Sequence, residues 1–330
     1  MKIKYLFVIL LIIGTVFSSV RAKEFAPVGT AAAQFLEIAQ DARGTGMGQA
    51  YTALVFDASS VFWNPAGIVG VNGKGIFLGY NQWVADINFG SFSFAWNFGS
   101  AGAIAISGVY LFTSDMDVTT VMQPEGTGET FSLNNHSFGL TYARKLTDKL
   151  AFGITLKSVR EYYYSYGYTT WAFDVGTVYH TGFRGLKIGM SIQHFGPEVR
   201  YNSSYIDYSN PRSYVDGNPV RFDKFSLPVN FRVGFGMNVF QEENQKLLVA
   251  GDMVHSNNNL EFYNLGLEYA FKNRFFLRGG YRINLDEGGL TLGLGVKFPW
   301  LDGKNGAIDY SFADRGIFNG IHRFSIGFDL

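Results

Sequence analysis

The residue types that most often carry catalysis or bind metals are few in this chain and are not spaced for either task. The sequence has no cysteine, so a thiolate nucleophile and a disulfide framework are excluded. No Gly-x-Ser-x-Gly motif of a serine hydrolase occurs. The five histidines show no metal-ligand spacing: His136, His180, His194, His255 and His322. We therefore expect no catalytic residue, no metal and no cofactor, and we do not expect an enzyme.

Three glycines near the N-terminus, Gly44, Gly46 and Gly48, resemble at first sight a phosphate-binding loop. No predicted strand precedes them, the Lys-Ser/Thr pair of a P-loop is absent, and Gln49 breaks the dinucleotide-binding spacing. The glycines better fit a place where the chain turns or passes close to another backbone.

These glycines belong to a compact stretch, Ala42 to Gly67, that does not read as strand. Residues Gln49 to Leu54 are compatible with a helix. Pro65 then forces Asn64 out of the helical region, and Gly67 permits another turn. This stretch must be positioned by the elements on either side of it.

On its N-terminal side, residues 1–22 are predicted to be a secretory signal peptide, with Lys2 and Lys4 before an apolar run and a Val20-Arg21-Ala22 cleavage pattern. The alternative is a membrane anchor, but the run is short of the roughly 20 residues that a spanning helix needs. Residues 23–72 have no strand pattern, and we expect them to form a hatch. A helix is predicted over Ala31 to Gln40, and it either packs on the mouth of the barrel or forms part of the hatch inside the lumen.

On its C-terminal side, the hydrophobic period changes to two. Between Leu227 and Phe240, six apolar residues alternate with polar residues or glycine, which strongly predicts a strand. Most of these segments are longer than strands of soluble sheets and suit a tilted crossing of a bilayer. About fourteen such segments follow the hatch, at 73–83, 86–98, 101–112, 133–146, 150–163, 168–180, 185–196, 227–240, 245–256, 259–271, 274–284, 288–299, 305–314 and 320–330.

The predicted connections alternate in length. The two long ones, 113–132 and 197–226, both fall on odd-numbered connections, whereas the even-numbered ones are mostly tight. All long loops therefore lie at one end of the sheet, as in transmembrane β-barrels. Residues 73–330 are thus predicted to form an all-β, antiparallel outer-membrane barrel of about fourteen strands, with its apolar face in contact with outer-membrane lipid.

The charge composition argues against a protein that binds nucleic acid. Charged residues make up 16% of the sequence, and removal of residues 1–22 leaves 24 basic and 27 acidic groups. A nucleic-acid partner would require a basic footprint, which is absent.

If the apolar face meets lipid, the opposite face of each strand lines the lumen. Charges of both signs fall there, and they predict either a conduit for a charged or amphipathic solute or an internal salt-bridge network that holds the hatch. The second interpretation is favoured because balanced charge gives no selectivity field. The predicted lumen charges are Lys157, Asp174, Arg232, Glu268, Arg278, Arg282, Lys297, Asp309 and Arg323.

The longest connection, 197–226, is rich in tyrosine and stiffened by proline. Such a loop can form a recognition surface, although tyrosines near the strands also suit the aromatic belt of a membrane barrel. The candidate recognition residues are Tyr201, Tyr205, Tyr208 and Tyr214.

The stretch Ala42 to Gly67 also carries a resemblance. An Ala-Arg-x-x-x-Met-Gly-x-Ala core, then Asp-Ala-Ser and Trp-Asn-Pro-Ala-Gly, resembles the N-terminal signature of the PorV/PorQ proteins, which belong to the wider FadL-type outer-membrane barrels. The resemblance marks a hatch motif with possible ligand contacts at Arg43, Gly44, Met47, Gly48, Trp63, Asn64 and Pro65.

Resemblance to PorV/PorQ implies a barrel that works with the type IX secretion system, together with secretion-machinery subunits and the C-terminal domains of secreted cargo. Resemblance to FadL-type barrels implies the alternative, passive uptake of a hydrophobic small molecule past the hatch. A surface enzyme or a purely structural barrel is the third possibility.

Overall fold

The computed structural model describes residues 28–285, 287–300, 303–318 and 320–330. The predicted signal peptide, residues 1–22, lies outside the described residues, as do residues 23–27 of the predicted hatch. Everything that follows refers to the described chain.

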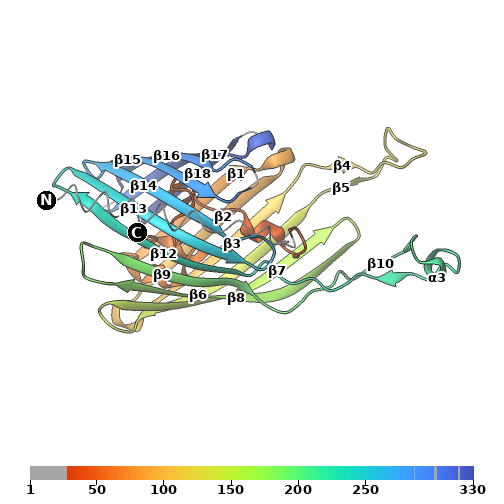
Figure 1. Ribbon diagram of the computed structural model, residues 1–330, viewed down its shortest axis with the longest axis horizontal. Helices are drawn as coiled ribbons and strands as arrows, with labels where there is room; N and C mark the ends of the chain where they lie inside the picture. The colour runs from red at the N-terminus through yellow and green to blue at the C-terminus, as the bar shows by residue number, and fades with distance from the viewer. Residues whose placement is uncertain (1–27, 286, 301–302, 319) are drawn as a thin grey trace.

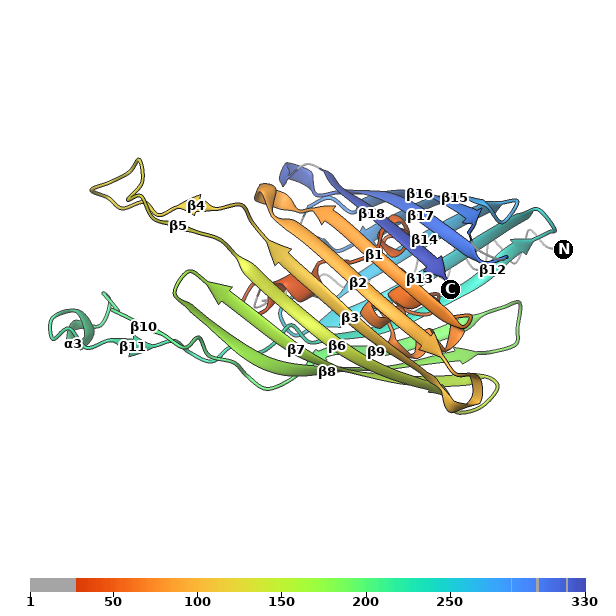
Figure 2. The ribbon, with the colours of Figure 1, turned by 180° about the vertical axis from the view of Figure 1, so that it is seen from behind.

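Fourteen of the described strands form one closed antiparallel barrel (Figures 1 and 2). Each strand pairs with its neighbours along the chain, and β1 pairs with β18 to close the ring. The barrel strands are β1 (Lys74–Gln82), β2 (Asn88–Asn97), β3 (Ala103–Phe112), β6 (Asn134–Lys145), β7 (Leu150–Tyr163), β8 (Tyr166–His180), β9 (Lys187–Phe195), β12 (Asn230–Gln241), β13 (Gln245–Ser256), β14 (Phe262–Phe271), β15 (Phe275–Ile283), β16 (Leu290–Pro299), β17 (Asn305–Asp314) and β18 (Gly320–Asp329). The predicted fold class and strand number are confirmed.

The alternating sequence determines which side chains face outward. In β16, Leu290, Leu292 and Leu294 are exposed on the outer face, whereas Thr291 is buried on the lumen face. Closure of the sheet pairs the backbone groups of every barrel strand with two neighbours, as a bilayer requires. None of the helices in the described chain is long and apolar enough to cross a membrane.

The long connections project from one end of the barrel and the tight turns close the other, where the C-terminus also lies (Figures 1 and 2). Two thin arms extend far beyond the barrel wall. The first arm contains β4 (Met116–Asp117) and β5 (Thr130–Phe131), and the second contains β10 (Ser204–Tyr205), α3 (Pro211–Tyr214) and β11 (Val220–Arg221). We call the end with the arms the outer end.

Residues 28–72, the described part of the hatch, lie inside the barrel and are mostly irregular (Figure 1). Four short helical segments occur: η1 (Gln34–Glu37), α2 (Ala42–Gly46), η2 (Ala58–Phe62) and η3 (Pro65–Gly70). The elements α2 and η3 contact different sides of the wall, β15 to β18 and β6 to β8 respectively. The hatch therefore bridges the lumen.

Two local helix expectations are wrong. The predicted helix over Ala31 to Gln40 is reduced to the single turn η1, because Ala33 is left-handed and the amides of Ala32 and Ala33 donate to the Ser226 carbonyl and the Glu161 carboxylate. Residues Gln49 to Leu54 form turns rather than a helix, and Gln49 has a positive φ of 65°. Tertiary hydrogen bonds outweigh helix propensity in both segments.

Close backbone approach seats the hatch on the wall. A Cβ built on Gly280 of β15 would lie 2.0 Å from the Gly48 nitrogen, and one on Gly46 would lie 2.9 Å from the Cα of Gly293 in β16. Only glycine fits at such contacts. The glycine cluster in the sequence therefore marks contact with a strand rather than with a phosphate.

Candidate functional site

The hatch motif is held together by Asp41, which precedes it. The Asp41 carboxylate caps α2 by accepting from the Gly44 amide at 2.5 Å, and it accepts from Trp63 Nε1 at 2.8 Å. Burial raises the pKa of Asp41 to about 7 against the opposing effect of the Gly44 hydrogen bond. The two ends of the motif, about twenty residues apart in sequence, therefore meet at one buried carboxyl group.

Asn64 joins the second half of the motif to the wall. Its Nδ2 donates to the carbonyls of Thr52 and Thr177 at 2.9 and 3.0 Å, and its Oδ1 accepts from the Ala66 amide at 3.2 Å. Pro65 begins η3 directly after this cap. Trp63 and Asn64 are both buried, and Met47 and Gly48 pack against β14 and β15. The motif residues thus serve hatch docking in this structure.

A chain of ion pairs fixes the hatch to the wall. Arg43 donates from Nε to Glu268 Oε2 at 2.9 Å and from Nη2 to Oε1 at 2.9 Å. Arg278 reaches the same carboxylate at 2.7 Å through Nε and Asp309 at 2.6 Å through Nη1. These charge-assisted hydrogen bonds connect α2 with β14, β15 and β17.

A second group of ion-paired and hydrogen-bonded side chains lies on the other side of the lumen, on β7, β8 and β9. Lys157 Nζ is 2.7 Å from Asp174 Oδ2 and 2.8 Å from His194 Nδ1, and the His194 amide donates to Asp174 Oδ1 at 2.7 Å. His194 has a positive φ of 61° and lies in a bulge of β9, where two residues of β9 face Asp174 of β8. The predicted lumen charges Lys157, Asp174, Glu268, Arg278 and Asp309 therefore form two separate networks.

The remaining predicted lumen charges behave differently. Arg232, Arg282 and Arg323 are buried, and Lys297 is exposed beside Phe276 near the tight-turn end. None of the four has an ion pair within 4 Å among the described residues. Sequence alone does not distinguish these cations from the paired ones.

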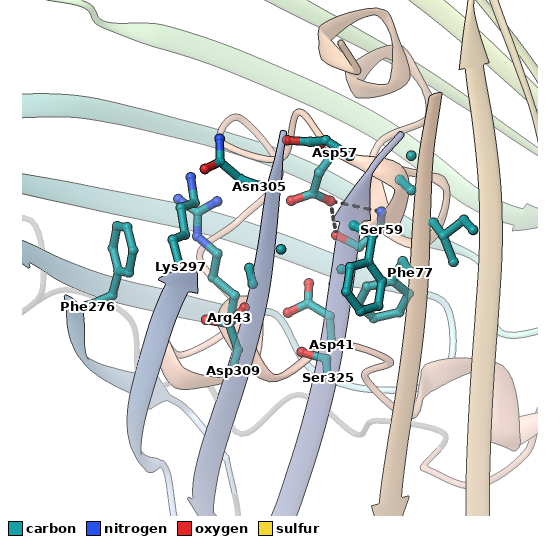
Figure 3. Close-up of a pocket in the computed structure, with 18 of the residues that line it drawn as sticks. Asp41, Arg43, Asp57, Ser59, Phe77, Phe276, Lys297, Asn305, Asp309 and Ser325 are labelled. Atoms are coloured by element: carbon teal, nitrogen blue, oxygen red, sulfur yellow. Dashed lines mark hydrogen bonds between the residues drawn. The ribbon is translucent and has the colours of Figure 1, made fainter. Parts of the chain in front are cut away.

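The inner cavity, of about 120 Å³, lies beside α2 toward the tight-turn end (Figure 3). Charged groups of both signs line it, including Arg43, Asp57, Lys297 and Asp309, together with the rings of Phe77 and Phe276. Asp57 accepts from the Ser59 amide at 2.8 Å and from the Ser59 hydroxyl at 2.5 Å.

The outer cavity is larger, about 410 Å³, and lies between η1 and the outer ends of the strands. Apolar and polar residues line it in about equal measure, and the apolar ones include Phe35, Ile38, Trp83, Leu111, Leu133 and Phe262. Arg232, Arg282 and Arg315 also line it. The hatch separates it from the inner cavity.

Glu161 is a buried hydrogen-bond centre that the sequence analysis did not single out. Its carboxylate accepts from the Ala33 amide at 2.9 Å, from Tyr163 at 2.6 Å, from Tyr201 at 3.2 Å and from Tyr168. The alternation of β7 could have identified it, because Glu161 lies four residues after Lys157 and therefore on the same, lumen-facing side of the strand.

The candidate recognition tyrosines occupy three different environments. Tyr201 lies at the base of the second arm, where its ring contacts those of Tyr163, Tyr166 and Tyr168, and burial raises its pKa. Tyr205 packs on Phe222, and Tyr208 is 81% exposed. The side chain of Tyr214 lies outside the described part of the structure.

The closed barrel, its apolar outer face and the hatch in its lumen define a transmembrane β-barrel of the bacterial outer membrane. The family described as type IX secretion system protein PorV matches residues 21–255, and the chain belongs to that family. The predicted PorV/PorQ resemblance is thereby confirmed. The match spans the hatch motif and both arms.

Solved structures place the fold among FadL-type barrels. The chain is similar to a Pseudomonas aeruginosa FadL homologue, with 12% identity and a TM-score of 0.56 over 88% of this chain and 98% of that chain. It is also similar to the Ralstonia pickettii toluene transporter TbuX, with 13% identity and a TM-score of 0.53 over 87% and 96%. At these identities the similarity concerns the fold alone. None of these descriptions names an enzyme.

A comparison with curated proteins finds no match to the chain.

Proposed function

We propose that this chain serves type IX secretion by holding secreted cargo at the outer face of the membrane, where its arms recognise the C-terminal domain of the cargo. The observation that carries the proposal is the family match, because it includes both arms as well as the hatch motif. The exposed apolar side chains at the arm tips supply a contact surface. They include Val121, Met122 and Tyr208, which are 98%, 89% and 81% exposed.

The filled lumen supports a binding role over conduction of a polypeptide. The backbone of Gly48 touches β15, the ion pairs of Arg43 tie α2 to the wall, and the inner cavity is only about 120 Å³. A polypeptide strand could pass only if the hatch left the barrel. Cargo is therefore handled outside the lumen, on the side from which the arms project.

Deletion of the tip of the second arm tests this proposal. Residues 204–221 contain β10, α3 and β11, and those two strands pair only with each other. Their replacement by a short glycine-serine linker should leave the barrel closed. We expect the shortened protein, purified from its native outer membrane after cross-linking, to lose cargo proteins that the full-length protein captures.

The control alters the opposite end of the barrel. Asp148→Ala with Lys149→Ala changes two exposed charges of a tight turn and should capture as much cargo as the unaltered protein. If the full-length protein captures no secreted cargo or machinery subunit, or if the shortened protein captures as much, the proposed role is wrong.

Passive uptake of a hydrophobic small molecule is the second candidate. The apolar side chains that line part of the outer cavity favour it, and TbuX, a toluene transporter, shares the fold. The test is toluene uptake by vesicles that contain the purified barrel. Saturable uptake above that of protein-free vesicles supports transport, and equal uptake excludes it for this solute.

A further inference from the structure

The inner cavity carries charges of opposite sign on facing walls. Figure 3 shows Arg43 and Lys297 on one side of it and Asp57 on the other. Neither Lys297 nor Asp57 forms an ion pair within 4 Å among the described residues. Asp57 accepts from Ser59 through Oδ1, and its other carboxylate oxygen points toward the cavity (Figure 3). The cavity therefore separates a basic wall from an acidic wall.

The basic wall includes donors without acceptors in the described chain. Arg43 uses Nε and Nη2 for Glu268, which leaves Nη1, and its side chain is 25% exposed. Tyr51 lines the cavity with its ring beside this guanidinium, 5.4 Å from the ring centroid to Cζ. The Tyr51 hydroxyl is buried and has no hydrogen-bond partner among the described residues. Such a hydroxyl is unfavourable, and an acceptor in the cavity would satisfy it.

The acidic wall consists of Asp57 from the hatch and Asp329 from β18. Asp329 lines the cavity and has no ion pair within 4 Å among the described residues. The other carboxylates that line the cavity are engaged, since Asp309 binds Arg278 and Asp41 binds the hatch as described above. Asp57 and Asp329 are thus the carboxylates that face the cavity without a cation.

Elsewhere in this lumen, opposite charges are in direct contact. Lys157 meets Asp174 at 2.7 Å, and Arg43 meets Glu268 at 2.9 Å. At the inner cavity, the hatch and the strands hold Lys297 apart from Asp57 instead. A molecule that carries both charges matches this arrangement, because each of its charged groups then meets the opposite charge on the protein.

The floor of the cavity leaves space for such a molecule. The lumen-facing residues of β1, β17 and β18 at this level are Gly75, Ala307 and Gly327, so the backbone of these strands is barely covered. A Cβ built on Gly327 would have one neighbour within 4 Å, the Ile76 carbonyl oxygen at 3.7 Å. The volume of about 120 Å³ suits a molecule of about ten non-hydrogen atoms, because one water needs about 10–15 Å³.

We propose that the inner cavity binds a small zwitterion with an oxyanion at one end and an ammonium group at the other. The oxyanion, a carboxylate or a phosphate, accepts from Lys297, Arg43 and Tyr51. The ammonium group donates to Asp57 and Asp329. Short peptides and phosphoethanolamine share this chemistry. The site is independent of the proposed secretion role, because it lies at the tight-turn end and the arms project from the other end.

Calorimetric titration of the barrel in phosphatidylcholine nanodiscs, with empty discs subtracted, tests this inference. The zwitterionic probes are glycylglycine and phosphoethanolamine. Glycylglycinamide and ethanolamine keep only the ammonium group, and N-acetylglycylglycine and inorganic phosphate keep only the anion. We expect one saturable site for at least one zwitterion, with an affinity at least about tenfold above that of both its single-charge analogues. The preferred zwitterion distinguishes a peptide from a phosphoethanolamine head group.

Two charge variants test the two walls separately. Lys297→Gln should weaken binding at least about tenfold and reduce the preference for the zwitterion over its ammonium-only analogue. Asp57→Asn keeps an acceptor for Ser59 and should instead reduce the preference over the anion-only analogue. The matched control is Lys272→Gln, which removes an exposed lysine from a tight turn at the same end and should leave the affinity unchanged.

A third variant tests the location. Gly327→Leu places a side chain in the cavity and should abolish binding without a change in charge. Gly279→Leu places the same side chain on the outer face, where an added Cβ has no atom within 4 Å, and should bind the zwitterion normally.

Absence of saturable binding for both zwitterions would overturn the proposal, as would equal affinity for a single-charge analogue. Unchanged binding in Lys297→Gln and Gly327→Leu would also decide against it. If Asp57→Asn does not fold, Lys297→Gln decides alone, because Lys297 has no ion pair among the described residues whose loss would destabilise the barrel. None of these outcomes depends on whether the arms capture cargo.

Discussion

The charged side chains in the lumen of this barrel differ in whether they form an ion pair. Glu268 is the clearest case, since one buried carboxylate receives Arg43 from the hatch and Arg278 from β15. Lys297 lies in the same region and lines the inner cavity, yet it has no ion pair within 4 Å among the described residues. Removal of the charge at Glu268 should therefore lower the free energy of unfolding more than removal of the charge at Lys297.

We expect Glu268→Gln to lower the free energy of unfolding by about 3 kcal/mol, because it leaves two guanidinium groups without their shared acceptor. Urea titration of the barrel in lipid vesicles measures this change. Lys297→Gln is the control and should change the same quantity by less than about 0.5 kcal/mol. A loss for Glu268→Gln no larger than that of the control would show that the ion pairs do not hold the hatch.

At the scale of elements, the contact between hatch and wall depends on backbone proximity. Gly280 faces the lumen and touches Gly48, whereas its neighbour Gly279 faces outward and would have no atom within 4 Å of an added Cβ. Alanine at either position reduces the freedom of the unfolded backbone, but only alanine at Gly280 would also clash with the hatch. A comparison of the two variants therefore separates these two effects.

Gly280→Ala should weaken hatch docking by about 1–3 kcal/mol, because its methyl group enters the space of the Gly48 backbone. Hydrogen exchange of residues 44–52 in the folded barrel is the measurement, and faster exchange is expected. Gly279→Ala should leave the exchange of this segment as it is in the unaltered protein. Equal exchange in both variants would contradict the close approach.

The barrel strands could be predicted from sequence because their signal is local. Each strand alternates apolar and polar residues, and this alternation does not depend on which strand it pairs with. The hatch could not be predicted in the same way. The turn at Tyr51 and Thr52 is fixed by Asp252, about two hundred residues away, and η1 replaces the expected helix because Ala32 and Ala33 donate to distant acceptors.

The candidate site was predicted only in part for the same reason. The lumen-facing parity identifies which charges point inward, but it does not say which of them meet. Arg278 pairs with Glu268 and Asp309, while Arg282, four residues further along the same strand, lines the outer cavity without an ion pair among the described residues. That difference depends on the height at which the hatch lies in the lumen.

At the scale of the whole molecule, the outer face of the wall must match hydrocarbon. Leu294 is 53% exposed in the middle of β16, whereas Val121 is 98% exposed at the tip of the first arm. Both are exposed apolar residues, but only the first lies on the lipid-facing wall.

Leu294→Arg should destabilise the inserted barrel by about 2–4 kcal/mol, the cost of a cation near the bilayer midplane. Folding into vesicles during urea titration measures it. Val121→Arg, in water, should cost less than about 0.5 kcal/mol. Similar costs for the two variants would mean that β16 does not face lipid.

The hydrogen bonds of Glu161 have a mechanical consequence. One oxygen, Oε2, accepts hydrogen bonds both from the Ala33 amide near the start of the described hatch and from the Tyr201 hydroxyl at the base of the second arm. Tension applied to that arm by a bound chain is therefore transmitted to the hatch through this carboxylate, and also through the hydrogen bond from the Ala32 amide to the Ser226 carbonyl at the other root of the arm. Whatever pulls the arm away from the barrel thereby also loosens the first anchor of the segment that fills it.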